Sequence, residues 1–183
     1  LVYGSNTITN AVVKVDTKDK ALLYSLNVDQ IKNAQFELPK TSLSGQVAND
    51  VLDYNLLAKD FKNKDRYAIS GNLQSKNGGD EISLDPKKLL LNYENWTLSD
   101  DNRIRFSNNA IFVDNFELSK DGNSIKLQSE SQGNNPPLAV DFKNFESLKK
   151  INFFQLFLEL TRFATLFLLR KNYISNFFTN IIF

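Results

Sequence analysis

Carboxylates are the side chains of this 183-residue chain that could most readily perform chemistry. Two of them facing one another across a cleft form the catalytic machinery of a glycosidase. No spacing in the sequence marks such a pair, so we expect most of these groups to lie on solvated strand ends and turns. The ten that stand out are Asp50, Asp53, Asp60, Asp65, Asp80, Glu81, Asp85, Asp100, Asp101 and Asp114.

The sequence lacks the residues that several other kinds of catalysis require. The chain contains no histidine and no cysteine, which excludes Ser-His and Cys-His nucleophiles, thiolate metal sites and disulfides. Residues 100–103 and 121–124 lack the spacing of a calcium loop and are better interpreted as turns. No glycine-rich phosphate-binding loop occurs either. We therefore expect no enzyme, no metal and no cofactor.

Composition divides the chain near residue 150. Residues 151–183 contain eight of the 15 phenylalanines, only four charged residues, and neither glycine nor proline. The formal net charge of the whole chain is +1, so the sequence offers no basic surface for nucleic acid. We predict two parts, a β-rich region over residues 1–148 and an apolar tail over residues 149–183.

The first part is patterned for β-strands. Residues 22–28 alternate apolar and polar side chains, and a similar alternation runs through residues 67–73, which is the period of a strand. Asp121-Gly122 stands between two alternating runs and predicts a tight hairpin. The stretch 50–64 is ambiguous, because its leucines would also suit a short helix.

Successive strands joined by short turns predict a mainly β fold, an antiparallel meander with one apolar side. In a closed sandwich that side packs against a second sheet, whereas in an open curved sheet it lines an apolar groove. The alternation alone does not choose between the two. The residues that we expect on the apolar side are Leu22, Tyr24, Leu26, Val28, Ile104, Phe106, Ile111, Val113, Phe116, Leu118, Ile125 and Leu127.

The tail admits three interpretations. Its uncharged runs are shorter than the roughly 18 apolar residues that a membrane-spanning helix needs. Phe153, Phe157 and Phe163 follow the spacing of an amphipathic helix over residues 153–169. The third interpretation is a non-native tail, because a shifted or truncated reading frame of an AT-rich gene would encode such a phenylalanine-rich, glycine-free sequence.

Three segments carry a family resemblance. Residues 82–98 run from Ile-Ser-Leu-Asp-Pro to a strand that ends in Asn-x-x-x-Trp, and residues 101–106 read Asp-Asn-Arg-Ile-Arg-Phe. Residues 111–129 contain Asn-Phe-Glu-Leu-Ser and then Gly-Asn-Ser-Ile-Lys-Leu. Over roughly residues 20–145 the sequence resembles the repetitive β region of the TamB family of translocation and assembly modules, in the form found in Bacteroidetes. This family belongs with the wider group of AsmA-like bridge proteins.

The resemblance implies a non-enzymatic protein of the cell envelope. Members of the family are anchored in the inner membrane and span the periplasm as a long, curved, taco-like sheet with an apolar trough. They are associated with outer-membrane protein assembly alongside an Omp85-type partner, and with phospholipid transport between the two membranes. By this resemblance the chain is an internal periplasmic segment without the anchor, and its twelve alternating residues line a groove for phospholipid or another acyl-chain ligand.

Two other hypotheses stay open. The first is a secreted adhesin or carbohydrate-binding β-sandwich, in which Trp96 and nearby asparagines contact the sugar. Half-buried packing is the more frequent role of a lone tryptophan. The second is a hydrolase that uses a pair of carboxylates on the same β framework, although the sequence selects no particular aspartate for it.

Overall fold

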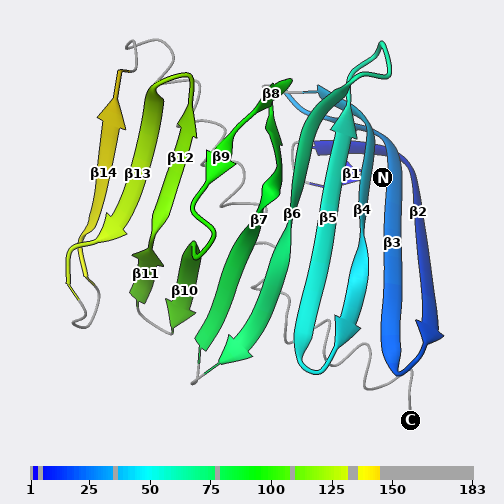
Figure 1. Ribbon diagram of the computed structural model, residues 1–183. Coiled ribbons are helices and arrows are strands. Elements are labelled where there is room, and N and C mark those ends of the chain that lie inside the picture. The colour runs from blue at the N-terminus through cyan, green and yellow to red at the C-terminus, as the bar shows by residue number, and fades with distance from the viewer. Residues whose placement is uncertain are drawn as a thin grey trace. The chain divides into compact units, whose positions relative to one another are not determined.

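A computed structural model of the chain describes residues 2–3, 6–34, 37–76, 79–107, 110–131 and 136–144. All of its strands belong to one compact unit, residues 1–143. The described residues form strands and turns and contain no helix (Figure 1). The tail that we predicted over residues 149–183, with its three interpretations, lies outside the described residues.

Fourteen strands follow one another along the described part of the chain. Their bounds are β1 (Val2–Tyr3), β2 (Asn6–Lys18), β3 (Ala21–Lys32), β4 (Glu37–Ala48), β5 (Val51–Lys59), β6 (Asp65–Lys76), β7 (Gly79–Leu91), β8 (Glu94–Asn95), β9 (Thr97–Leu98), β10 (Arg103–Ser107), β11 (Ala110–Asp114), β12 (Phe116–Lys120), β13 (Asn123–Ser129) and β14 (Leu138–Lys143).

The strands form two antiparallel sheets. The larger sheet has ten strands in the order β1-β2-β3-β4-β5-β6-β7-β10-β11, with β8 also paired to β7. The smaller sheet has four strands in the order β14-β13-β12-β9. Strands β1 to β7 therefore lie side by side in chain order. This arrangement confirms the predicted open antiparallel meander (Figure 1).

Four of the loops within the described residues have two residues and join consecutive strands: Asp19-Lys20, Asn49-Asp50, Asn92-Tyr93 and Asp121-Gly122. Both residues of each loop have positive φ, as a type I′ turn requires. This turn matches the twist of the strands that it joins, and Asn, Asp and Gly adopt it at the lowest cost. The hairpin predicted at Asp121-Gly122 is confirmed.

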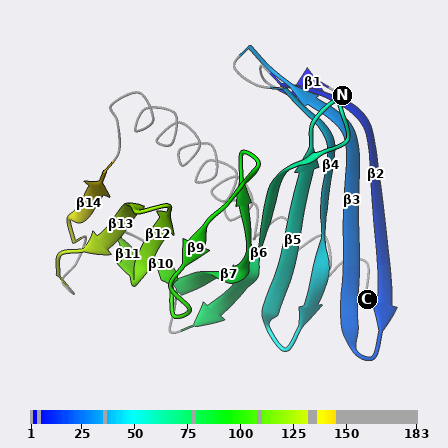
Figure 2. The same cartoon turned by 45° about the horizontal axis from the view of Figure 1, so that its top comes forward.

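The larger sheet bends across β2, β3 and β4 (Figure 2). Asn10 and Lys40 have φ angles of 49° and 48°, and the pairing of β3 with both neighbours skips Asp29 between them. The Asn10 amide donates a hydrogen bond to the Asp29 carboxylate at 2.8 Å. A residue with a left-handed backbone conformation interrupts the extended backbone of a strand. Because these residues lie side by side across the sheet, the three neighbouring strands change direction along one line.

Strand β5 resolves the ambiguous stretch, which is a strand over Val51–Lys59 and contains no helix. Leu52 and Leu56 lie on one side of the sheet and Leu57 on the other, since side chains alternate along a strand. Strand β5 has β4 and β6 as neighbours on its two sides. These ladders outweigh the weak helical spacing of the leucines.

The chain passes between the two sheets on either side of β9 and again at Asn115, the single residue between β11 and β12. Asn115 has a φ of 51°, and the chain passes there from the larger to the smaller sheet. Close by, the backbone N–H of Val113 donates to the Ser129 hydroxyl at 2.9 Å. The sheets lie side by side in both views rather than stacked (Figures 1 and 2). The closed sandwich, left open by the alternation, is therefore wrong as the architecture of these strands.

Candidate functional site

Cross-strand rows build the apolar side of the larger sheet. Directly paired residues of antiparallel strands place their side chains on the same face. The register of the strands therefore shows which side chains align. One row, called the Leu22 row below, crosses eight strands and is aliphatic at every position but the first. It consists of Thr17, Leu22, Val47, Leu52, Leu73, Ile82, Ile104 and Val113.

A second row, called the Leu26 row, crosses six strands and is aliphatic throughout. It consists of Val13, Leu26, Leu43, Leu56, Ile69 and Leu89.

The two rows differ in exposure along their length. In the Leu26 row, Val13 on the edge strand is 67% exposed, whereas Leu43, Ile69 and Leu89 are buried. In the Leu22 row, the six side chains from β3 to β10 are all half-buried. Together the rows form the apolar face, and the Leu22 row is its most evenly accessible part.

Tyrosines and glycines alternate between the two rows. Tyr24 pairs with Gly45, Gly45 with Tyr54, and Tyr54 with Gly71. A Cβ on Gly45 or Gly71 would lie 2.8 Å from the hydroxyl of Tyr24 or Tyr54, respectively. Each tyrosine therefore lies over the glycine beside it, where a larger residue has no room.

The tyrosines of this row stay protonated near neutral pH. The Tyr24 hydroxyl donates to the Asp53 carbonyl oxygen at 2.9 Å. Burial, and then the charge of Asp53, raises the pKa of Tyr24 to about 12. Burial likewise raises the pKa of Tyr54. Two neutral phenols thus continue the apolar face without adding charge to it.

The opposite side of the same strands is mostly polar, apart from a row of Leu57, Ala68 and Leu90. One of its rows consists of Lys14, Ser25, Ser44, Asn55 and Ser70. Ser70 donates to the Asn55 side-chain oxygen at 2.7 Å. In the strands of the larger sheet, two chemically different surfaces therefore lie back to back.

A hollow of about 640 Å³ is lined mainly by polar residues of β4–β7, among them Asn55, Asn72 and Ser83. Asp85 and Asp100 also border it. Its lining does not include Trp96, the sugar contact in the adhesin hypothesis. The hollow and the tryptophan therefore do not form one site.

Strand β7 contains a large bulge beside the apolar face. Ile69 pairs with Leu89 and Gly71 with Leu84, so β7 advances by five residues while β6 advances by two. Pro86 lies within this bulge and has no N–H to offer a ladder. The bulge shifts the alternation of β7, yet Leu84 and Leu89 both remain on the apolar face.

The side chain of Asn102 replaces a missing part of the ladder at this bulge. The pairing of Ile82 with Ile104 would place Asn102 opposite Leu84. Its side-chain oxygen accepts from the Leu84 N–H at 2.9 Å, and its amide donates to the Leu84 carbonyl at 2.9 Å. The same amide donates to the Ser99 carbonyl at 2.8 Å. Asn102 is 2% exposed, so this interaction is a structural one.

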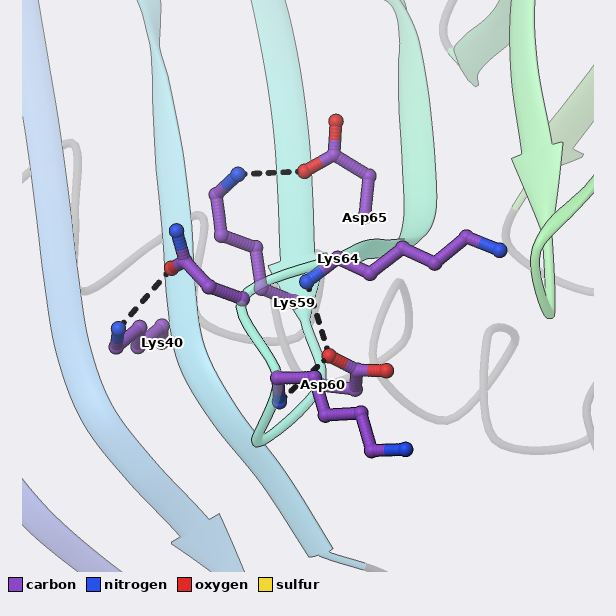
Figure 3. A network of polar contacts seen from close by, with 7 residues as sticks. Lys40, Lys59, Asp60, Lys64 and Asp65 are labelled. Carbon is purple, nitrogen blue, oxygen red and sulfur yellow. Dashed lines mark hydrogen bonds and ion pairs between the residues drawn. The ribbon is translucent and has the colours of Figure 1, made fainter.

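The turn between β5 and β6 carries a network of polar contacts (Figure 3). The Asp60 carboxylate accepts the backbone N–H groups of Lys62 and Lys64, each at 2.9 Å. The hydrogen bond from Lys64 is the main cause that lowers the pKa of Asp60. Lys59 and Asp65 form an ion pair beside it at 2.6 Å. These contacts close a turn, and nothing in their arrangement requires a substrate.

The twelve predicted residues fall into two groups. Eight lie on the apolar face of the larger sheet: Leu22, Tyr24, Leu26, Val28, Ile104, Phe106, Ile111 and Val113. The other four share one side of the smaller sheet: Phe116, Leu118, Ile125 and Leu127.

The two groups differ in burial. In the larger sheet Ile111 is 50% exposed, Val28 and Val113 are buried, and the other five are half-buried. In the smaller sheet all four are at most 3% exposed. Contact of either group with lipid stays a prediction.

Sequence reasoning missed the members of the apolar face on β4, β5 and β7. In β4 the signal was present, because Leu43 and Val47 alternate with polar residues across Gly45. In β5 the clustered leucines imitated a helix. In β7 the bulge between Leu84 and Leu89 breaks the alternation, and only the register shows that both belong to one surface.

The described residues contain neither a cluster of metal ligands nor a membrane-spanning helix. In that part of the chain, no group of three Asp, Glu, His or Cys side chains is arranged to hold a metal ion. Over the same residues there is no helix with the length and hydrophobicity to cross a membrane.

The chain was also compared with known proteins. No family model, no curated protein and no solved structure matches it.

Proposed function

We propose that this chain is a non-enzymatic segment of a periplasm-spanning envelope protein, and that its apolar face holds the acyl chains of phospholipids passing between the two membranes. The observation that carries the proposal is the Leu22 row, an unbroken line of half-buried aliphatic side chains across successive strands. The sequence resemblance to TamB-like bridges points to the same role, with an Omp85-type protein as the outer-membrane partner.

The dimensions of the row suit an acyl chain. Strands lie about 4.8 Å apart, so the half-buried part of the row, from β3 to β10, is roughly 24 Å long. The hydrocarbon core of a bilayer is about 30 Å thick, so one acyl chain covers roughly 15 Å of it. A single chain could therefore lie along the row with aliphatic contact over its whole length.

The energetics also suit a passive conduit. Removing an acyl chain from water contributes about 0.8 kcal/mol per CH₂ group, and an apolar surface provides this without any polar group. Because the gain is non-directional, a chain could slide along the row without breaking specific bonds. The polar side of the same strands would face the aqueous periplasm.

Site-specific photocrosslinking tests the proposal, and β3 offers a matched pair of positions. Leu26 lies on the apolar face and Ser25 on the polar side, and both are half-buried. Phe106 and Arg105 form a second such pair on β10. In the parent envelope protein within intact cells, we expect a photoreactive residue at Leu26 or Phe106 to capture phospholipid.

The residues Ser25 and Arg105 are the controls, and they should capture little or no phospholipid. Equal labelling at Leu26 and Ser25 would contradict the proposal, because it would indicate nonspecific association. Absence of lipid at both Leu26 and Phe106, alongside normal expression of the protein, would also contradict it.

A further inference from the structure

The hollow on the polar side of β4–β7 is a feature that the lipid function does not use. Its floor contains two directly paired couples of that side, Asn55 with Ser70 and Asn72 with Ser83. Each strand that forms the floor has a neighbouring strand on both sides. The hollow therefore lies within the sheet and not at one of its edges.

The bulge of β7 and the turn between β9 and β10 form the walls of the hollow. The bulge contributes Asp85 and the turn contributes Asp100. The buried Asn102 holds both walls, because its side chain forms hydrogen bonds with the N–H and C=O of Leu84 and with the carbonyl of Ser99. The walls are therefore in place before a ligand binds, which lowers the entropic cost of binding.

The floor offers neutral hydrogen-bonding groups that the fold does not use. Ser70 donates to the Asn55 side-chain oxygen at 2.7 Å, so the Asn55 amide remains available as a donor. The side chains of Asn72 and Ser83 are half-buried and form no hydrogen bond with another described residue. Polar groups in such positions pair with water or with a ligand.

The charges around the hollow restrict the class of ligand. Asp53, Asp85 and Asp100 outnumber Lys88, the single cation of the lining, so phosphates and other anions are disfavoured. The mainly polar floor offers an acyl chain little apolar contact. A neutral ligand rich in hydroxyl groups suits the lining, because each hydroxyl both donates and accepts and carboxylates are strong acceptors for it.

We propose that the hollow binds a neutral oligosaccharide, held by the Asn72–Ser83 couple on the floor and by Asp85 and Asp100 on the walls. Its volume of about 640 Å³ lies within the range of small-molecule sites, about 300–1,000 Å³. The site lies on the side of the sheet opposite to the apolar face, so the inference does not depend on the lipid function. It also differs from the sugar contact of the adhesin hypothesis, because Trp96 does not line the hollow.

Isothermal titration calorimetry of the full chain with trisaccharides tests this inference. Maltotriose and tri-N-acetylchitotriose are neutral, and each should bind with a Kd below about 1 mM. Trigalacturonate is an acidic trisaccharide of similar size. It should bind about tenfold more weakly or worse, because its carboxylates meet the like charges of Asp85 and Asp100.

A pair of double variants locates the binding. Asn72→Ala with Ser83→Ala removes hydrogen-bonding groups of the floor and should raise the Kd for the neutral trisaccharides about tenfold. Asn27→Ala with Ser42→Ala is the matched control, because it removes another directly paired Asn–Ser couple from the same side of the sheet, outside the hollow. The control should leave the Kd unchanged, and circular dichroism should show a native β spectrum for both double variants.

Four outcomes would overturn the inference. The first is failure of both neutral trisaccharides to bind at up to about 10 mM. The second is an equal rise in Kd in the two double variants, since the loss would then not arise at the hollow. The third is tighter binding of trigalacturonate than of the neutral sugars. The fourth is a Kd that rises only in Trp96→Phe, which would place the sugar at the tryptophan.

Discussion

The larger and the smaller sheet share a period-two pattern but differ in how they bury their apolar sides. In the larger sheet the Leu22 row is half-buried across successive strands. In the smaller sheet Phe116, Leu118, Ile125 and Leu127 are at most 3% exposed. The comparison separates two roles that the sequence pattern alone does not distinguish. A sealed side contributes to stability, whereas an accessible side can also bind.

Truncation of one aliphatic residue in each sheet would test this comparison most strongly. Ile125 is 1% exposed, so Ile125→Ala should lower the free energy of unfolding by about 3 kcal/mol through lost burial and a residual cavity. Leu22→Ala removes a half-buried side chain and should cost only about 1 kcal/mol. Urea denaturation followed by circular dichroism measures both. Equal losses would mean that the two sides contribute alike to stability.

The bulge in β7 should show the next largest effect. Asn102→Ala leaves the N–H and C=O of Leu84 without their partner and should cost about 2 kcal/mol. Asn27→Ala is the matched control, because Asn27 is an exposed asparagine on the polar side of β3, and it should change stability by less than about 0.5 kcal/mol. Hydrogen exchange gives a local readout, since the Leu84 amide should exchange faster only in the Asn102 variant.

The turn between β5 and β6 should show the smallest effect, and it should depend on pH. The pKa of Asp60 lies below its ordinary value of 3.8 in the folded chain, so the charged form is favoured by folding. The contribution of Asp60 to the free energy of unfolding is therefore complete above pH 3.8. It is lost as the pH falls through the lowered pKa of the folded chain.

The Asp60→Asn variant should lack this contribution. Urea midpoints measured between about pH 2 and pH 6 should show native and variant proteins converging as the pH falls. A constant difference across this range would show that the charge of Asp60 is not the cause.

The alternation of side chains was sufficient to predict the antiparallel meander, and Asp121-Gly122 was sufficient to predict the hairpin; that the meander is open was expected only from the family resemblance. The meander and the hairpin depend on local signals, namely a period of two and a loop whose residues tolerate positive φ. The bend of the larger sheet depends on Asn10 and Lys40, which are thirty positions apart in sequence and share a line only because β3 lies between them. No local pattern contains that information.

The candidate site was predictable in part for the same reason. Leu22 and Ile104 were identified from their own strands, but their membership of one row depends on the register of the strands between them. The Tyr24 ring over Gly45 likewise requires the pairing of β3 with β4. Burial was not predictable, because alternation gives the side on which a residue lies and not what covers it.

The chain-order pairing of β1 to β7 has a consequence for how such a protein changes over evolution. Each strand from β1 to β6 has partners only one turn away in sequence, so a hairpin added among them disturbs its immediate neighbours and no distant contact. Duplication of a short piece of the gene would lengthen the sheet by whole strands without redesign of the rest. The length of the sheet could then change by one hairpin at a time.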